Sequence, residues 1–550
     1  MKFFPLFLFL LTSSMAVYTQ SLAKARADIY YKRFQAAKVR LYDIIEKDPG
    51  NPDTWYWLGN IYLKEKKADS AKKILQDGIA FHEANKFSKK QYPLVFIGWA
   101  HLLLDNGAIT ESRIHMEEIL KLGKFKDPNI LLAVARAHIE SKNGDIAWAI
   151  ELLEKAAKKD KKNSEIFVAT GDAYRKQING SKAIINYDKA ISIDPSYAEA
   201  YYKKGLIYKT QNNTEIFIER FSKAVTADSL YGPAIYELYY HYFYRDLKVA
   251  GNLLERYIRN SDPSIEHSYM MADYLFVSKK FQDAVSYANN IILNQGKSTK
   301  PRLYKLIAYS QAAIGDTVTA EKNMEKYFLF QPPDKIVAKD YTLMAKLTES
   351  IYEDKKKALD WYKKALSLES NQKDKLNYMI SLAEIQKELG NREREAVWRE
   401  NIYNSKEQPN NLDIYNWGVS LYMSENYLKA DSVFELYSNK YPNQIYGHLW
   451  QARCNAIIDS TMEKGLAIPY YKKLIEITNS DKNNNSAIIL KAYGYLGTYE
   501  ANIKKDYTTS LYYFEKMLEI DPGNSDAQKY VSALKNWIET SEDSEPLKNN

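Results

Sequence analysis

Histidine, cysteine and glycine patterns usually reveal catalytic or metal-binding chemistry, and none of those patterns occurs in this chain of 550 residues. The seven histidines are scattered, and none forms an H-E-x-x-H motif or faces a second histidine at helical spacing. The phosphate-binding G-x-x-x-x-G-K-[ST] loop, the G-x-G-x-x-G turn and the G-x-S-x-G elbow are also missing from the sequence. Cys454, the single cysteine, lies in an apolar stretch and is expected to be a small buried side chain. We therefore predict no enzymatic activity, no metal site and no cofactor.

Tyrosine is the residue type whose number and spacing suggest a function, namely contact with a ligand. The chain has 46 tyrosines, against 19 phenylalanines and 9 tryptophans. Tyr236, Tyr240 and Phe243 follow one another at i, i+4 and i+7, which is the spacing of one helix face. A tyrosine ring combines a large rigid surface with a hydroxyl that can stay hydrated, and tyrosine is enriched at protein interfaces for that reason. The alternative is that these rings pack between neighbouring helices.

Composition limits the elements that could carry such a face. The 21 glycines and 16 prolines are few for this length, which excludes a large β-sandwich or propeller, because those folds need frequent turns. A hydrophobic content of 45% excludes general disorder, and the negative mean hydropathy excludes a polytopic membrane protein. The net charge of +8 comes from interleaved acidic and basic residues, so it does not indicate nucleic-acid binding.

A repeat of 34 residues organises the sequence. It is clearest where Phe167, Gly171 and Tyr187 are followed by Tyr201, Gly205 and Phe221, and then by Ile235, Tyr239 and Glu255. Each unit contains two stretches of about a dozen residues with apolar positions at i, i+3, i+4 and i+7, which predicts a pair of amphipathic helices. A small residue at the eighth position allows the two helices to approach closely. Asp-Pro, as in Asp194-Pro195, is expected to end the second helix, because the residue before proline avoids the helical conformation.

These residues resemble those of the tetratricopeptide repeat (TPR) family, whose signature is W-x2-L-G-x2-Y…A-x3-F…P. One copy consists of Trp55, Leu58, Gly59, Tyr62 and Ala71, and another of Ile414, Trp417, Gly418, Ala430, Phe434 and Pro442. The resemblance implies an all-α solenoid, a right-handed superhelix of about fourteen helix-turn-helix repeats over residues 21–538. A C-terminal capping helix is expected at residues 525–538, where it would cover the last apolar face.

The resemblance also implies a concave groove, lined by the first helix of each repeat, in which TPR proteins bind extended peptides or partner helices. The predicted partner-binding residues in this groove are Tyr202, Tyr236, Tyr240, Phe243, Met270 and Tyr274. The family's carboxylate-binding clamp needs lysine and asparagine at fixed groove positions. This chain has Val168 and Asp172 in one unit and Tyr202 and Leu206 in the next. We therefore do not expect recognition of a chaperone tail.

The first residues are typical of a secretory signal. Lys2 precedes an apolar run from Phe3 to Leu11, and small or polar residues follow. This run is too short to span a membrane, which takes about 20 apolar residues. We predict a signal peptide at residues 1–20, cleaved after Ala16 or a few residues later, and export to the periplasm. A buried N-terminal helix is the alternative.

The other irregular segments are polar. Residues 539–550 carry four acidic side chains without apolar periodicity, which predicts an acidic, disordered tail. Four breaks in the repeat are either long loops or bends in the array, at residues 84–91, 294–301, 404–411 and 479–485.

The repeats fill the chain between signal and tail, so no room is left for a catalytic domain. We predict a non-enzymatic scaffold or adaptor that binds a protein or peptide partner along its concave groove, in the bacterial cell envelope. The alternative is a glycan- or nutrient-binding component of an outer-membrane system that stacks sugars on the groove tyrosines. No nucleic-acid partner and no transmembrane span are expected, and the sequence leaves the oligomeric state open.

Overall fold

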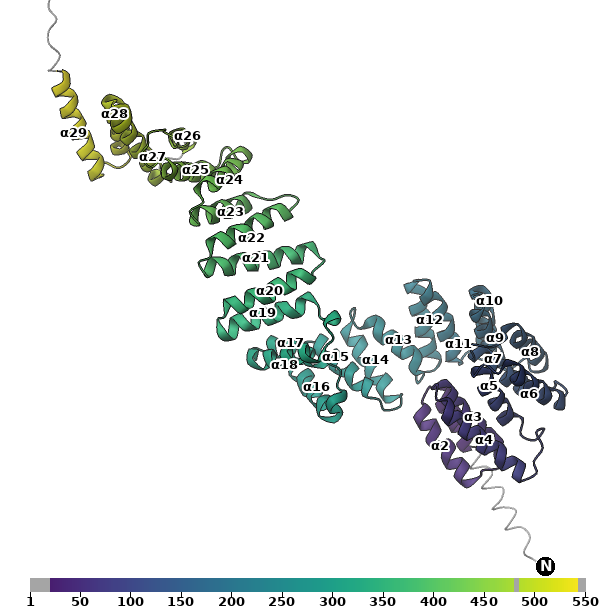
Figure 1. The fold of residues 1–550 in the computed structure, drawn as a ribbon. Coiled ribbons are helices and arrows are strands. Elements are labelled where there is room, and N and C mark those ends of the chain that lie inside the picture. The colour runs from purple at the N-terminus through teal and green to yellow at the C-terminus, as the bar shows by residue number, and fades with distance from the viewer. Residues whose placement is uncertain (1–19, 479–483, 543–550) are drawn as a thin grey trace, which may run out of the picture. The chain divides into compact units, whose positions relative to one another are not determined.

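The computed structural model describes residues 20–478 and 484–542, and within them every regular element is a helix (Figure 1). The all-α prediction is therefore confirmed. The chain divides into two compact units between Thr299 and Lys300, inside one of the predicted polar breaks. We call these parts unit 1 and unit 2. The predicted signal peptide, apart from its last residue, and most of the break at residues 479–485 lie outside the described residues.

Unit 1 consists of consecutive helix pairs joined by short turns. The first pair is formed by residues 20–30, which we call the N-terminal helix, and α2. The labelled helices of unit 1 are α2 (Phe34–Lys47), α3 (Pro52–Lys64), α4 (Ala68–Ala84), α5 (Pro93–Asp105), α6 (Ile109–Leu122), α7 (Pro128–Glu140), α8 (Ile146–Lys159), α9 (Ser164–Lys176), α10 (Gly180–Ile193), α11 (Ala198–Thr210), α12 (Thr214–Ala227), α13 (Gly232–Tyr242), α14 (Leu247–Arg259), α15 (Ile265–Val277), α16 (Phe281–Gln295) and η1 (Gly296–Ser298).

Unit 2 continues the same construction and ends on a single helix. Its helices are α17 (Arg302–Ala313), α18 (Thr317–Phe330), η2 (Pro333–Lys335), α19 (Ala338–Tyr352), α20 (Lys355–Leu368), α21 (Gln372–Glu388), α22 (Arg392–Ser405), α23 (Asn411–Met423), α24 (Tyr427–Lys440), α25 (Ile445–Ile458), α26 (Ile468–Thr478), α27 (Ser486–Tyr499), η3 (Glu500–Lys504), α28 (Tyr507–Ile520) and α29 (Ser525–Glu542). The described residues thus form fourteen helix pairs, in agreement with the predicted number, and α29 follows the last pair. It covers Phe514 of α28 with Val531 and Leu534.

Glycine at the eighth repeat position sets the distance between the paired helices. A Cβ atom added to Gly171 would lie 2.4 Å from Cε1 of Tyr187, and one added to Gly205 would lie 2.6 Å from Cε1 of Phe221. Both rings are fully buried. The predicted close approach is therefore present, and the space that a side chain would need is filled by the aromatic residue of the second helix.

The Asp-Pro pairs end the second helices as expected. Helix α2 ends directly before Asp48, α10 before Asp194 and α28 before Asp521. The C-terminal boundary differs from the prediction, because α29 continues to Glu542 and includes the first four residues of the segment assigned to the tail. No glycine or proline interrupts this stretch before Pro546, so the backbone hydrogen bonds of the helix can continue.

One turn carries a residue that fits its backbone poorly. Ile178, between α9 and α10, has a φ of 60° and a side chain that is 93% exposed. Gly107 and Gly315 occupy the same kind of turn in other pairs, with φ values of 88° and 87°. A β-branched residue is strained in this left-handed region and here gains no packing in return.

Replacing Ile178 by glycine is expected to stabilise the protein by about 0.5–1 kcal/mol, because relief of the strain exceeds the added flexibility of the unfolded chain. Thermal and urea unfolding followed by circular dichroism would measure the change. Ile185→Gly is the matched control, since Ile185 is exposed in the middle of α10, and glycine there should destabilise by about 1 kcal/mol. If both variants lose stability equally, the strain at Ile178 is refuted.

The beginning of α2 is held by the loop between α14 and α15. The carboxylate of Asp262 accepts hydrogen bonds from the backbone nitrogens of Gln35 at 2.6 Å and Ala36 at 3.1 Å. Asp262 thus caps the first turn of α2, where free N–H groups and the helix dipole favour a negative charge. The Nε atom of Arg33 donates a further hydrogen bond, at 2.8 Å, to the carbonyl oxygen of Asn260. These contacts join parts of unit 1 that are more than two hundred residues apart.

Aromatic rings extend the same contact. The ring centroid of Tyr30, at the end of the N-terminal helix, lies 5.5 Å from that of Tyr197 and 5.2 Å from that of Tyr231. Tyr197 and Tyr231 directly precede α11 and α13. The first helix pair of unit 1 therefore packs against its sixth, seventh and eighth pairs, and the helices between them enclose a space.

Candidate functional site

A groove with a volume of about 1380 Å³ lies inside unit 1. Its lining comes mainly from the N-terminal helix and from the first helices of the following pairs, namely α3, α5, α7, α9 and α11, together with the segments just before α11 and α13. We call this space the inner groove. It is large enough for a segment of polypeptide, since ligand pockets for small molecules measure about 300–1,000 Å³.

Ion pairs between neighbouring helices cover one part of the groove wall. Arg136 of α7 contacts Glu165 of α9 with an N–O distance of 2.9 Å, and Arg26 of the N-terminal helix contacts the same carboxylate at 3.6 Å. Burial acts to lower the pKa of Arg136, but the surrounding acidic groups, chiefly Glu165, together outweigh burial and raise this pKa. Both cations are thus committed to protein partners.

A second set of ion pairs is centred on Lys203 of α11. Its ammonium contacts Asp172 of α9 and, at 3.3 Å, Glu199 of its own helix. Lys32, after the N-terminal helix, also approaches Glu199, at 3.7 Å. Burial raises the pKa of Glu199, but the surrounding cations, chiefly Lys203 and Lys32, hold it down at about 2. Glu199 is therefore ionised at neutral pH.

Acid is expected to destabilise unit 1 through Glu199. Its folded pKa of about 2 lies below the unfolded value of about 4.3, so its contribution to stability is complete above that unfolded value and is lost as the pH falls toward 2. The loss should reach up to about 3 kcal/mol. Hydrogen exchange of peptides from α9 and α11, measured at pH 7, 4 and 2.5, would detect it.

Glu199→Gln should flatten this pH dependence, whereas Glu154→Gln should leave it unchanged. Glu154 is an exposed carboxylate on α8, in the same unit. An equal acid response in wild type and Glu199→Gln would show that Glu199 is not the group that links pH to stability.

Two buried polar atoms in the groove wall have no hydrogen-bond partner among the described residues. They are Oδ1 of Asn60, a residue that is 8% exposed, and the hydroxyl of Tyr231, which is fully buried. Buried polar atoms in native proteins are nearly always hydrogen-bonded. Both atoms are inaccessible to solvent, so a ligand lying in the groove does not reach them.

The six predicted partner-binding residues do not form one continuous surface. Tyr236 and Tyr240 lie side by side on α13, 36% and 49% exposed, with ring centroids 4.7 Å apart. Phe243 and Met270 are buried in the core that surrounds α13. These two side chains leave little surface for a partner in this conformation.

The remaining two predicted residues lie in different places. Tyr202 lines the inner groove, and its ring packs against Phe221 and Tyr231 at centroid distances of 5.6 and 5.7 Å. Tyr274 is half-buried and places its hydroxyl against Gly251. Packing between helices, the alternative considered for the tyrosines, thus accounts for part of the set, and a binding role for Tyr202, Tyr236 and Tyr240 stays a prediction.

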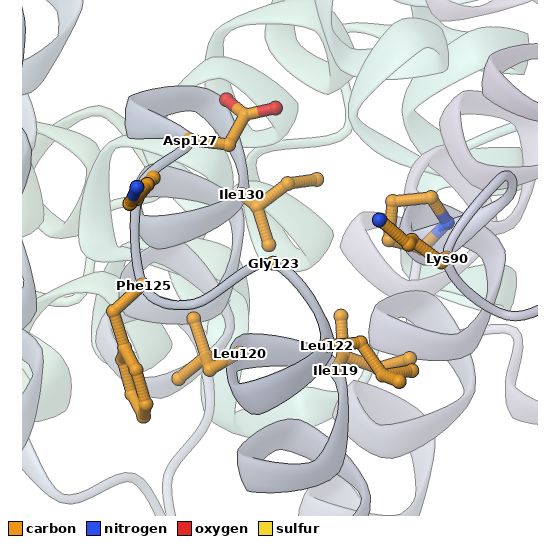
Figure 2. A pocket seen from close by; sticks show the side chains of 10 residues that line it. Lys90, Ile119, Leu120, Leu122, Gly123, Phe125, Asp127 and Ile130 are labelled. Carbon is orange, nitrogen blue, oxygen red and sulfur yellow. The ribbon is translucent and has the colours of Figure 1, made fainter.

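A much smaller hollow of about 190 Å³ lies between the end of α6 and the start of α7 (Figure 2). It is lined by Lys90, Pro93, Ile119, Leu120, Leu122, Gly123, Phe125, Lys126, Asp127 and Ile130. This volume accommodates one side chain at most, so the inner groove is the better candidate for a functional site.

The charged residues of the groove were not among those predicted from the sequence. Apart from Lys203 and Glu199, which lie on one helix, the groove pairs join different helices: Arg136 and Glu165 are 29 residues apart, and Lys203 and Asp172 are 31 residues apart. A signal therefore existed, namely opposite charges separated by about one repeat.

A metal centre or a membrane-spanning helix would change this assignment, and the described part of the chain has neither. It holds no group of three His, Cys, Asp or Glu side chains arranged to bind a metal ion. None of its helices is long and apolar enough to cross a membrane.

Family models match two parts of unit 1. A tetratricopeptide repeat model matches residues 29–85, another tetratricopeptide repeat model matches residues 198–229, and a TPR repeat model matches residues 171–212. No curated protein matches the sequence.

Several solved structures resemble parts of the chain. The C-terminal part of a TPR repeat-containing protein from Cytophaga hutchinsonii is 25% identical and covers 48% of this chain and 99% of its own, with a TM-score of 0.33. A tetratricopeptide repeat protein from Parabacteroides merdae is 18% identical over 46% of this chain and 98% of its own, with a TM-score of 0.29. The human IFIT1 dimer with m7Gppp-AAAA is 13% identical over 74% of this chain and 94% of its own, with a TM-score of 0.32. With TM-scores below 0.5, none of the three bears on what this chain binds.

Proposed function

Because this chain is a tetratricopeptide repeat protein, we propose that it is a non-catalytic adaptor that binds an extended segment of a partner protein in the inner groove of unit 1. TPR proteins are scaffolds for protein interactions. The observation that carries the proposal is the size and lining of the groove: about 1380 Å³, bordered by the first helices of consecutive pairs.

The lining suits a polypeptide. Aromatic side chains such as Tyr56, Trp57 and Tyr202 offer apolar surface to a bound segment. The wall charges of the two sets of ion pairs, centred on Glu165 and on Lys203, already have partners, so the ligand does not need to neutralise them.

We also propose that the protein acts in the cell envelope of a Gram-negative bacterium, in the periplasm. The composition of residues 1–20, with Lys2 before a short apolar run, supports export. Fractionation of cells followed by N-terminal sequencing of the mature protein tests this. A cytosolic protein that retains Met1 would refute it.

Site-specific photo-crosslinking tests the groove. A photoreactive phenylalanine analogue in place of Tyr202, in the full-length protein, should form covalent adducts with polypeptide in cell-envelope extracts. The matched control places the same analogue at Ile185, which is exposed on the second helix α10 and does not line the groove. Protease-sensitive adducts at Tyr202 but not at Ile185 are expected, and equal labelling at both positions would contradict groove binding.

A glycan ligand is the second candidate, and the exposed neighbouring rings of Tyr236 and Tyr240 favour it. The two ring planes are inclined by 62°, so they do not form one flat platform for a sugar. The same photoreactive analogue in place of Tyr240 tests this candidate. Adducts there that resist protease and yield to glycosidases would support a glycan over a protein segment.

A further inference from the structure

The edge of the inner groove formed by the C-terminal ends of the first helices carries a surplus of basic side chains. Lys66 and Lys142 follow the last turns of α3 and α7, and Arg175 and Lys176 are the last two residues of α9. All four line the groove, and we call them the basic rim.

The basic rim is not neutralised by the described part of the protein. Lys66, Lys142 and Arg175 are exposed and form no ion pair with any described residue, and Lys176 donates a hydrogen bond to the carbonyl oxygen of Ser141 at 3.1 Å. Two acids lie on the same edge: Glu140 contacts Lys64 at 2.5 Å, and Asp105, the last residue of α5, contacts His101 at 3.8 Å. The four basic residues still outnumber them. The rim therefore presents positive charge to an incoming ligand.

The opposite edge of the groove is occupied by the chain itself. There the N-terminal helix contacts the N-terminal ends of α9, α11 and α13, through Arg26 on Glu165 and Tyr30 on Tyr197 and Tyr231. A ligand is thus expected to enter from the edge that carries the basic rim. Helix α9, with 13 residues, spans about 20 Å, which is the length of about six residues of extended polypeptide.

We propose that the inner groove takes an extended segment of a partner protein whose acidic side chains are held at the basic rim while about six uncharged or aromatic residues run inward. This inference rests on the proposed function and adds the chemical class of the partner. The acids deeper in the groove, Asp172, Glu165 and Glu199, are already paired, so no cation of the ligand is required there.

Charge layout favours an acidic protein segment over a nucleic acid. A nucleic acid carries a phosphate at every nucleotide, so phosphates would also lie next to Asp172 and Glu199 on the inner wall. An acidic protein segment can carry its negative charge at one end only. That end would face the positive basic rim, and the uncharged remainder would lie along the inner wall, where acidic and basic side chains are already paired.

Fluorescence polarisation with a defined probe tests the proposal on the full-length protein. The probe is a labelled twelve-residue peptide with eight Gly, Ser and Tyr residues followed by four Glu, and its counterpart has four Gln instead. The acidic peptide should bind about tenfold tighter at low salt, and added salt should reduce the difference.

Charge-reversal variants test whether the basic rim causes the preference for the acidic probe. The variant Lys66→Glu/Lys142→Glu/Arg175→Glu should weaken binding of the acidic probe about tenfold or more. The matched control Lys72→Glu/Lys158→Glu/Lys189→Glu changes the same net charge at exposed positions on second helices and should stay within twofold of wild type. Circular dichroism of both variants verifies that each is folded.

Three results would overturn the proposal. Equal affinity for the Glu and Gln peptides, or equal loss in both triple variants, would show that the rim does not select acidic segments. Tighter binding of a twelve-nucleotide oligothymidylate than of the acidic peptide would favour nucleic acid instead. A variant that ends at Ile538 lacks the acidic residues at the C-terminus of the chain. If this variant binds the probe at least tenfold tighter than wild type, those residues, and not a partner protein, occupy the inner groove. Crosslinking at Tyr202 reports any protein segment, so the proposed function can survive failure of this charge-specific test.

Discussion

Phe221→Ala is expected to lower the free energy of unfolding of unit 1 by about 3–5 kcal/mol. The ring of Phe221 is fully buried, lies against Gly205 and packs on Tyr202 and Phe217 at centroid distances of 5.6 and 5.8 Å. Removing it leaves a cavity between α11 and α12 that the rigidly paired helices cannot close. Urea unfolding, combined with hydrogen exchange to assign the change to unit 1, measures the effect.

Phe125→Ala is the matched control for this prediction. Phe125 is a partly exposed phenylalanine in the same unit, after α6, and its loss should cost less than about 1 kcal/mol. If Phe125→Ala and Phe221→Ala destabilise unit 1 equally, the paired-helix core at Gly205 is not the main source of stability there.

Tyr30→Ala is expected to release the N-terminal helix from the second half of unit 1. The change removes the ring contacts with Tyr197 and Tyr231 and should cost about 2–3 kcal/mol, less than a fully buried aromatic because Tyr30 is half-buried. Hydrogen exchange of peptides covering residues 20–47 should then accelerate. Because the same helix lines the inner groove, binding of the acidic probe should also weaken.

Tyr30→Phe removes the hydroxyl and keeps the ring, so it measures the contribution of the hydroxyl alone. The Tyr30 hydroxyl is only 3.4 Å from the backbone nitrogen of Glu199, so this hydrogen bond is long and its loss should have little effect. Exchange of residues 20–47 that stays slow in Tyr30→Ala would show that the polar contacts of this region, such as the hydrogen bonds to Asp262 and Asn260, hold it in place without the Tyr30 ring.

Local features of the fold could be predicted because they depend on neighbours in sequence. Gly171 and Tyr187 lie within one helix pair, 16 residues apart, so a repeat pattern is enough to bring them together. The stop at Asp194-Pro195 depends on two adjacent residues alone. The extension of α29 past Ile538 was missed because acidic, polar residues suggest a tail although they do not prevent a helix.

The candidate site was predicted less completely. The i, i+4 spacing of Tyr236 and Tyr240 correctly predicted that the two rings are neighbours, since both residues lie on helix α13. Whether a ring faces solvent or a neighbouring pair depends on how successive pairs are rotated, and Phe243 proved to be buried. The groove charges were overlooked because most of their ion pairs join residues from different helices, such as Arg136 with Glu165 and Lys203 with Asp172.

The sequence by itself determined the helix pairs, their number and their close packing, because each of these follows from residues at most one repeat apart. Only the tertiary structure decided that Asp262 caps α2, that Tyr30 reaches Tyr197 and Tyr231, and that the helices between enclose a groove with a basic rim. The physical reason is accumulation: each pair is rotated slightly against the previous one, and small rotations set by side-chain packing add up over seven pairs. A short sequence pattern does not specify these accumulated rotations.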